Sequence, residues 1–325
     1  MNTHRNYDPV LWMQHAWRNR LQSLLLLSLM AGYLGLLGWL LWGPQGLMIL
    51  LGVGLFGMLF HPTLSPWLIM RMYGARPIQP DEAPVVHQLV GDLAARAGLE
   101  TRPTLYYVPS RMLNAFTVGS SDQSAIAITD GLLRHLDTRE IVGVLAHEIS
   151  HIRNNDLWVM GLADLFSRAT SLLSTLGQLL LLFSLPLMLF SHVRLNWLAM
   201  LLLIFAPTLS ALTQMALSRT RETVADLQAV QLTGDPEGLA LALAKIENIQ
   251  GGWLERVFMP GRRQPQPSVL RSHPQTDDRI RQLMNLKPGD PGWIDARGGH
   301  QDSLHPGLQS PVQRHPRWHI NGLWY

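Results

Sequence analysis

Cysteine is absent from this chain of 325 residues, and charged residues are scarce. Without cysteine the chain can have no disulfide framework, no cysteine-ligated zinc site and no thiol nucleophile. Charged residues make up 15% of the sequence, whereas an ordinary soluble domain has about 25%. These values argue against both a fully soluble globular protein and a disordered one. The net charge of +3, without a basic stripe, argues against a nucleic-acid partner.

The shortage of charge is concentrated in residues 21–70, 169–193 and 195–218, which contain no Asp, Glu, Lys or Arg. A membrane-spanning helix needs roughly 20 apolar residues. The sequence therefore predicts four transmembrane helices in two hairpins, the first hairpin made of 21–42 and 47 to about 69. A Gly-Pro-Gln-Gly turn joins these two helices, and two prolines near residue 65 are expected to kink or shorten the second. A buried helical hairpin in a large soluble core is the alternative.

The arginines predict how the hairpins face. They lie on one side of the predicted spans, where the chain enters and leaves each hairpin, whereas the two opposite turns hold Arg194 alone. The arginines on the first side are Arg5, Arg18, Arg20, Arg71, Arg76, Arg153, Arg168, Arg219 and Arg221. By the positive-inside rule, both termini and the long polar segments are expected in the cytoplasm.

The polar segments are expected to form one cytoplasmic domain that the second hairpin interrupts. The predicted organisation is an N-terminal cytoplasmic segment (1–20), the first transmembrane hairpin (21–70), the first part of the domain (71–168), the second hairpin (169–218), the second part of the domain (219–287) and a flexible tail (288–325). Within the domain we expect helices at 83–99, 138–154, 236–249 and 277–286, and short strands at 104–108, 115–119 and 125–129. Asp137 followed by Glu140 resembles a capping box for the second of these helices.

That capped helix carries the sequence His147-Glu148-Ile149-Ser150-His151. Histidines four residues apart share one face of a helix, so both imidazoles can reach one metal ion. Glu148 lies beside this pair, where its carboxylate can take a proton from a water that the metal activates. An exposed helix with two incidental histidines is the alternative, but Ile141, Val142, Val144 and Leu145 indicate that this helix is buried. The sequence therefore predicts a zinc site.

A catalytic zinc site usually has three protein ligands, so a third is needed. The fourth predicted span continues without a helix breaker through Glu222 and Asp226, which lie one turn apart on the same face. Glu222 could bind the metal while Asp226 accepts a hydrogen bond from a ligand imidazole. Spacing alone leaves open a second interpretation, in which the two are an exposed acidic pair with Arg219 and Arg221 as partners.

The chain resembles the HtpX family of membrane-bound zinc metalloproteases, which are gluzincins related to the CAAX prenyl endopeptidases. The resemblance covers roughly residues 21–286, and the order of predicted spans and motifs matches as well. It rests on Asn114-Ala115-Phe116, the motif His147 to His151, the stretch Arg221 to Asp226, and Ser272-His273-Pro274 followed by Arg279-Ile280. The resemblance implies one zinc ion per chain, with Glu222 as the third ligand.

The resemblance also implies roles for residues that spacing does not single out. Asn114, Ala115 and Phe116 are similar to the edge strand along which a substrate backbone is added as a further strand, an ordinary core strand being the alternative. His273 is similar to a residue that supports the oxyanion, although a capping or surface role is equally compatible with the sequence. Thr223 stands where the family usually has an aromatic residue, and the tail histidines His300, His305, His315 and His319 have no counterpart in the family.

Together these features predict an α+β membrane protein: four transmembrane helices and a mainly helical, zincin-like protease domain with a small β-sheet. The expected function is zinc-dependent endopeptidase activity on misfolded or damaged membrane proteins at the cytoplasmic face of a bacterial inner membrane. Removal of a prenylated tripeptide is the nearest alternative, and a catalytically inactive membrane scaffold is another. A four-span channel is disfavoured because the spans carry no acidic or basic residue to line an ion path.

Overall fold

The computed structural model describes residues 9–59, 66–190, 197–250 and 276–286. The contacts within the chain divide these residues into two compact units. The sheet unit contains the described residues of Thr63–Leu157 and those from Arg221 onwards, and the helical unit contains those of Tyr7–Pro62 and Trp158–Thr220. The chain is mostly helical with one small sheet, as predicted, and each unit is described by itself.

The sheet unit contains four strands in the order β1-β2-β4-β3. The strands are β1 (Arg76–Pro77), β2 (Thr104–Val108), β3 (Ala115–Gly119) and β4 (Ser124–Thr129). β2 and β4 are parallel, and the other two pairs are antiparallel. The three predicted strands are confirmed to within one residue. The position of β3 at the end of this order matters for the site described below.

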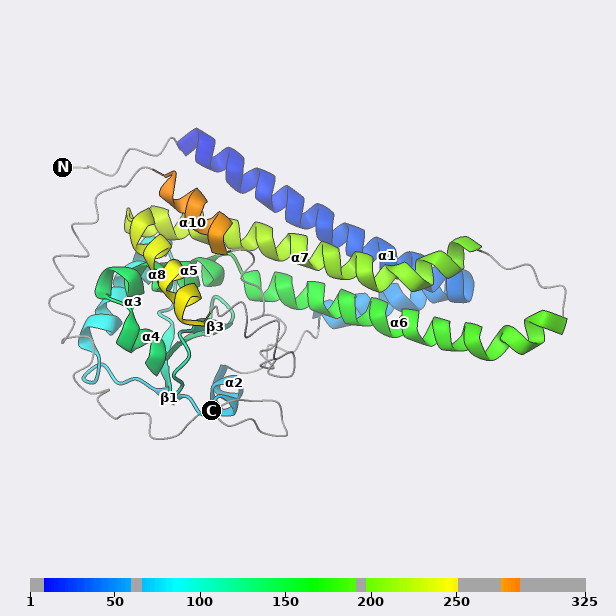
Figure 1. The fold of residues 1–325 in the computed structure, drawn as a ribbon, viewed down its shortest axis with the longest axis horizontal. Helices are drawn as coiled ribbons and strands as arrows, with labels where there is room; N and C mark the ends of the chain where they lie inside the picture. Colours follow the sequence, from blue (N-terminus) through cyan, green and yellow to red (C-terminus); the bar gives the residue numbers. More distant parts are fainter. Residues whose placement is uncertain (1–8, 60–65, 191–196, 251–275, 287–325) are drawn as a thin grey trace. The chain divides into compact units, whose positions relative to one another are not determined.

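Among the described residues, six helices lie wholly in this unit, and the part of α7 from Arg221 onwards belongs to it as well (Figure 1). They are α2 (Pro66–Met72), α3 (Pro84–Ala97), α4 (Asp130–His135), α5 (Thr138–Arg153), α8 (Pro236–Gln250) and α10 (Thr276–Met284). The four predicted helices of the domain are confirmed as α3, α5, α8 and α10. The sequence did not predict α4, a single short turn of helix that Thr129 caps by accepting a hydrogen bond from the Leu132 amide.

Helix α5 lies at the centre of the sheet unit and contacts α3, α8 and β3. The predicted capping box is present: the Glu140 amide donates to Asp137 Oδ1 and the Asp137 amide donates to Glu140 Oε2, both at 2.8 Å. The apolar face of α5 is buried in the main core. Gly143 of this helix lets the backbone of α8 come close at Leu239. The start and the buried face of α5 therefore fix which way its later residues point.

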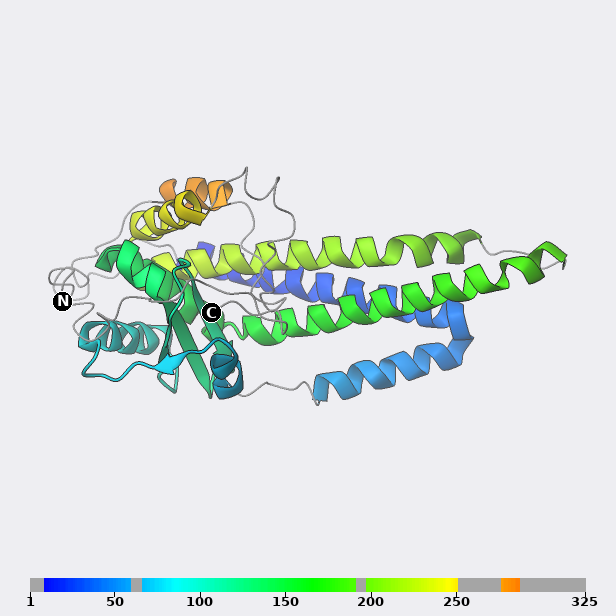
Figure 2. The same ribbon diagram turned by 60° about the horizontal axis from the view of Figure 1, so that its bottom comes forward.

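The helical unit contains most of α1 (Pro9–Leu59), α6 (Asp156–Phe190) and α7 (Trp197–Thr233). Helix α1 is interrupted at Gly43, whose φ of 64° and ψ of −151° are not helical, and Figure 2 shows the chain reversing direction there. Gly38 and Gly46 face each other across this reversal so closely that a side chain on Gly46 would meet the Gly38 carbonyl. The close approach therefore requires glycine at position 46.

Three helices among the described residues are long and apolar enough to span a membrane: Leu21–Leu50, Asp156–Phe183 and Met200–Thr233. The predicted count of four spans is therefore not confirmed. The difference arises in the first hairpin, where the long apolar segment includes the reversal at Gly43. Within the predicted second span, the described residues belong to α1, which runs to Leu59, and to α2, which begins at Pro66. Proline at a first helical position is favourable, so Pro66 starts a new helix.

Small and polar side chains join α6 to α7 inside the helical unit. Ser174 and Gln178 both donate hydrogen bonds to the Leu203 carbonyl, the second at 3.1 Å. Leu203 and Ala206 in turn pack against Leu37 of α1. Such packing and interhelical hydrogen bonding hold helices together where lipid removes the hydrophobic driving force.

Candidate metal centre

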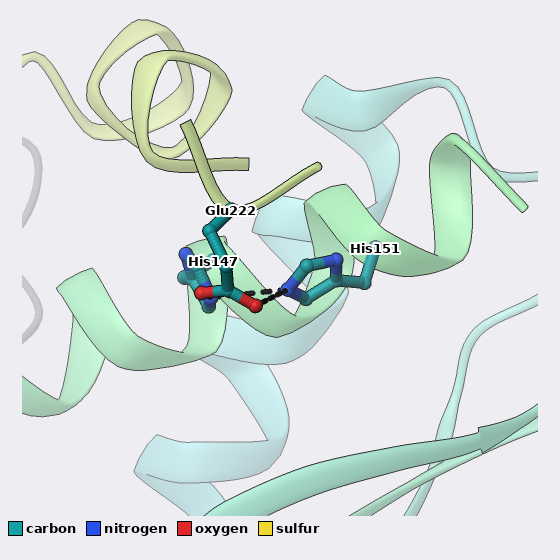
Figure 3. A group of neighbouring side chains, drawn as sticks. All are labelled: His147, His151 and Glu222. Carbon is teal, nitrogen blue, oxygen red and sulfur yellow. Dashed lines mark hydrogen bonds and ion pairs between the residues drawn. The ribbon is translucent and has the colours of Figure 1, made fainter. Parts of the chain in front are cut away.

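Helices α5 and α7 bring three predicted ligands together (Figure 3). His147 and His151 lie one turn apart on α5, with their Nε2 atoms 3.1 Å from each other. Glu222 of α7 places one carboxylate oxygen 3.4 Å from His147 Nε2 and the other 3.6 Å from His151 Nε2. Two ligands of a tetrahedral zinc ion, each bonded at 2.0–2.1 Å, lie about 3.3 Å apart. The three side chains therefore have the mutual spacing of zinc ligands.

Each imidazole has a carboxylate on its other nitrogen. His147 Nδ1 lies 2.9 Å from Asp226 Oδ1 on α7, and His151 Nδ1 lies 2.8 Å from Asp156 Oδ2 at the start of α6. A carboxylate beside Nδ1 favours a proton on that nitrogen and leaves Nε2 available to bind a metal. The two Nε2 atoms lie 3.1 Å apart, so a cation held between them would contact both imidazoles.

The charges around the imidazoles favour the same conclusion. Burial lowers the pKa of His147, but Asp226 and Glu222 outweigh it and raise that pKa to about 10. Burial also lowers the pKa of His151, but the hydrogen bond to Asp156 and the charges of Glu222 and Asp156 together outweigh it and raise that pKa. Both shifts mean that the surrounding carboxylates stabilise positive charge on the imidazoles. A metal ion held by the Nε2 atoms would receive the same stabilisation.

Two arginines neutralise part of this negative charge. Arg279 of α10 contacts both Asp226 oxygens at 2.7 Å and one Glu222 oxygen at 3.0 Å. Arg221 of α7 contacts the free oxygen of Asp156 at 3.0 Å. Among the described residues, three carboxylates (Asp156, Glu222 and Asp226) and two guanidinium groups thus surround the imidazoles. The carboxylates outnumber the guanidinium groups, which favours a bound cation, and an oxygen and two imidazole nitrogens are donors that suit zinc.

Glu148 is buried beside the cluster and is held by the sheet. The Thr117 hydroxyl of β3 donates a hydrogen bond to Glu148 Oε2 at 2.7 Å. A carboxylate adjacent to the metal ligands, but not among them, is suitably placed to act as a general base. Thr117 could not be predicted from the sequence, because its contact with Glu148 depends on how β3 packs against α5.

The remaining predicted site residues fall in two groups. Asn114 immediately precedes β3, whose first residues are Ala115 and Phe116, and β4 is the only strand that pairs with β3 among the described residues. Ala115 and Phe116 have buried side chains, so the other edge of β3 would offer a substrate mainly its backbone. His273 and the tail histidines lie outside the described residues.

The sequence did not assign Asp156 or Arg279 a role at the metal site, and it considered Arg221 only as a partner of an exposed acidic pair. Arg279 belongs to the motifs behind the family resemblance, but spacing cannot show that α10 brings it to α7. The sequence does contain one indication that Asp156 lies near the site, namely the Asn154-Asn155 pair that follows α5. Asparagine favours turns and tolerates left-handed backbone. Such a turn reverses the chain and brings the next residue back towards the helix.

Comparison with known proteins agrees with this geometry. The sequence model of peptidase family M48 matches residues 80–287. The chain belongs to peptidase family M48. A protease HtpX homolog of Sulfurihydrogenibium sp. (strain YO3AOP1) is 34% identical over 297 residues, which cover 85% of this chain and 99% of the relative. Protease HtpX homologs of Pyrococcus furiosus and Aquifex aeolicus are also 34% identical, over 81% and 78% of this chain and 94% and 89% of their own.

Membership of M48 confirms the predicted resemblance to the HtpX family. This M48 chain is accordingly a metallopeptidase, and its long apolar helices identify it as a membrane protein. The family implies a metal, for which His147, His151 and Glu222 form a suitable site among the described residues.

Proposed function

We propose that the chain is a zinc-dependent endopeptidase of the membrane. The observation that carries this proposal is the convergence of His147, His151 and Glu222, with Glu148 buried next to them in an M48 chain. A scaffold protein would have no need to bury so many ionisable groups, which is costly unless they are paired or bind a metal.

Zinc, when bound, would supply Lewis-acid polarisation of the peptide carbonyl and a lowered pKa for water. His147, His151 and Glu222 hold the metal. Glu148 accepts a proton from the attacking water and returns it to the leaving amine. Thr117 holds the Glu148 carboxylate in place through its 2.7 Å hydrogen bond, so that the same oxygen atoms face the reacting groups in both transfers.

The edge of β3 is proposed to bind the substrate. An extended peptide added next to β3 would hydrogen-bond to its backbone near Asn114, Ala115 and Phe116. Thr117, two residues after Ala115 on the same strand, contacts Glu148. A peptide bound along this edge would therefore pass close to the general base.

We further propose that the protein is multi-pass in a bacterial inner membrane, with two hairpins and both termini and the active site in the cytoplasm. The distribution of arginines supports this orientation. Glu222 follows Arg219, the first charged residue after the apolar part of α7, by only three positions. A metal ligand so near a membrane span in sequence suits misfolded or damaged membrane proteins, or their cytoplasmic loops, as substrates.

The proposal can be tested with detergent-solubilised full-length protein and casein as an unfolded substrate. The protein is purified with a chelator, and zinc is then added back. We expect zinc to restore cleavage by the unmodified protein, but not by Glu148→Gln, which lacks the base and keeps the three ligands. Glu100→Gln alters an exposed carboxylate in the sheet unit and should cleave like the unmodified protein.

Two results would contradict the proposal, and measuring both cleavage and zinc binding tells them apart. If Glu148→Gln cleaves as fast as the unmodified protein, Glu148 is not the base. If the unmodified protein neither cleaves nor binds zinc, the site assignment is wrong and the scaffold alternative takes its place.

A further inference from the structure

The contact between His151 and Asp156 depends on an unusual turn. Helix α5 ends at Arg153, and α6 begins at Asp156 after two asparagines. Asn155 has a φ of 52°, and among the described residues it is the one non-glycine residue with a positive φ. Left-handed backbone is unfavourable for most side chains but is tolerated by asparagine. This turn folds the chain back, so that Asp156 reaches the imidazole five residues earlier.

Helix α7 holds this turn in two places. The side-chain amides of Asn154 and Gln228 exchange hydrogen bonds of 2.8 and 3.1 Å. Arg221 contacts the Asp156 oxygen that does not face His151, at 3.0 Å. The carboxylate of Asp156 is buried and has a charged partner on one oxygen and an imidazole on the other. A buried carboxylate bound at both oxygens has little freedom to rotate.

The two ligand histidines therefore have matching supports. His147 contacts Asp226, and Asp226 is held by Arg279. His151 contacts Asp156, and Asp156 is held by Arg221. Arg221 directly precedes the ligand Glu222 in α7, so one helix supplies both a metal ligand and the arginine that holds Asp156.

We propose that Asp156, held by Arg221, is a positioning residue for His151. Asp156 accepts the Nδ1 proton, which makes Nε2 the nitrogen that binds the metal, and it sets the orientation of the ring. The inference rests on the proposed zinc site. It assigns a role to the first residue of α6, which the Asn155 turn places against the metal helix.

The test measures zinc affinity by competition with a chelator of known affinity, using full-length protein in detergent. Removing a group that orients a metal-bound histidine typically weakens metal binding 10–100-fold. We expect a loss of about this size for Asp156→Ala. A smaller loss is expected for Asp156→Asn, whose amide oxygen can still accept the Nδ1 proton. Arg221→Gln should also weaken zinc binding, and Arg221→Lys should restore most of the affinity because one charged contact is kept.

Asp164→Asn is the matched control, because Asp164 lies on the same helix in an exposed pair with Arg168. It should bind zinc like the unmodified protein. The cobalt(II) form gives a second readout, since its visible absorption reports ligand geometry: the band should change in Asp156→Asn and remain unchanged in Asp164→Asn.

Unchanged zinc affinity, within twofold, in Asp156→Ala and Arg221→Gln would overturn the inference while leaving the zinc site intact. Loss of thermal stability in the metal-free protein without loss of zinc affinity would have the same meaning, because it indicates a purely structural pair. If Asp156→Ala does not fold, Asp156→Asn and Arg221→Gln decide, since both roughly keep the side-chain volume. Failure of the unmodified protein to bind zinc would instead refute the proposed function and this inference together.

Discussion

Thr117 connects the sheet edge to the general base. Its backbone lies opposite Ile126 in the antiparallel pair of β3 and β4, while its hydroxyl donates to Glu148 Oε2 at 2.7 Å. The side chain is 3% exposed, so no bulk water can readily replace this donor. The strand proposed to align the substrate therefore also orients Glu148.

Replacing Thr117 by valine removes the hydroxyl and nearly keeps the volume. A lost hydrogen bond to a charged group costs about 1.5–3 kcal/mol, which corresponds to about tenfold to a hundredfold in rate if it is fully felt in the transition state. We expect Thr117→Val to lower kcat for casein cleavage by about this factor with little change in KM. Thr117→Ser keeps the donor and serves as the control. A kcat of Thr117→Val equal to that of the unmodified protein would show that the hydrogen bond does not support catalysis.

The ligands and their supports differ in how well sequence can predict them. His147 and His151 were predicted because the period of a helix places residues four apart on one face. Asp156 was not, because its contact requires the left-handed backbone of Asn155. Arg221 and Asp156 are separated by 65 positions, and only the packing of α7 against the turn unites them. Local periodicity therefore predicts ligands on one element, but not the groups that other elements bring to them.

At the scale of elements, short sequence patterns predicted the helices and strands that interactions within a few residues stabilise. The Asp137–Glu140 capping box begins α5, and short apolar runs between turn residues predicted β2, β3 and β4 to within one residue. β1 was missed because a two-residue strand carries no periodicity and exists only through its pairing with Tyr106 and Tyr107. The break before α2 was anticipated as a proline effect, but the separate helix was not.

The contact between α5 and α8 gives a prediction at this scale. A Cβ atom on Gly143 would lie 2.9 Å from backbone atoms of Leu239, so Gly143→Ala must push the two helices apart. Overpacking typically costs about 1–3 kcal/mol, of which the better helix propensity of alanine returns up to about 1 kcal/mol. We expect a lower thermal unfolding midpoint of the full-length protein, by a few degrees.

Gly91→Ala provides the matched comparison on α3. Its Cβ would meet only the guanidinium end of Arg102, which is the tip of a flexible side chain and can move aside. The midpoint of this variant should stay the same or rise slightly, because alanine favours the helix. Equal effects of the two substitutions would mean that the close approach of α8 is not what requires glycine at position 143.

At the scale of the whole molecule, the sequence predicts membrane association more firmly than the number of spans. Charge-free runs are sufficient to indicate apolar helices, and three candidate spans are present among the described residues. The count depends on how the first long run is divided, and Gly43 divides it by its backbone conformation and not by any change in polarity. The orientation rests on arginines, of which Arg5 and Arg194 lie outside the described residues. One experiment that locates the first hairpin turn and the sheet unit relative to the membrane therefore tests both the number of spans and the orientation.

The absence of cysteine makes that test simple, because every introduced cysteine is the only one in the chain. Gln45 is exposed just after the reversal at Gly43, and Gln123 is exposed between β3 and β4. In spheroplasts, a membrane-impermeant maleimide should label Gln45→Cys directly, because the first hairpin is proposed to reach the outer face. Gln123→Cys should be labelled only after the membrane is opened with detergent. If both positions are protected until then, the first hairpin does not cross the bilayer. If Gln123→Cys is labelled at once, the sheet unit faces outwards, and misfolded proteins of the cytoplasmic face cannot be its substrates.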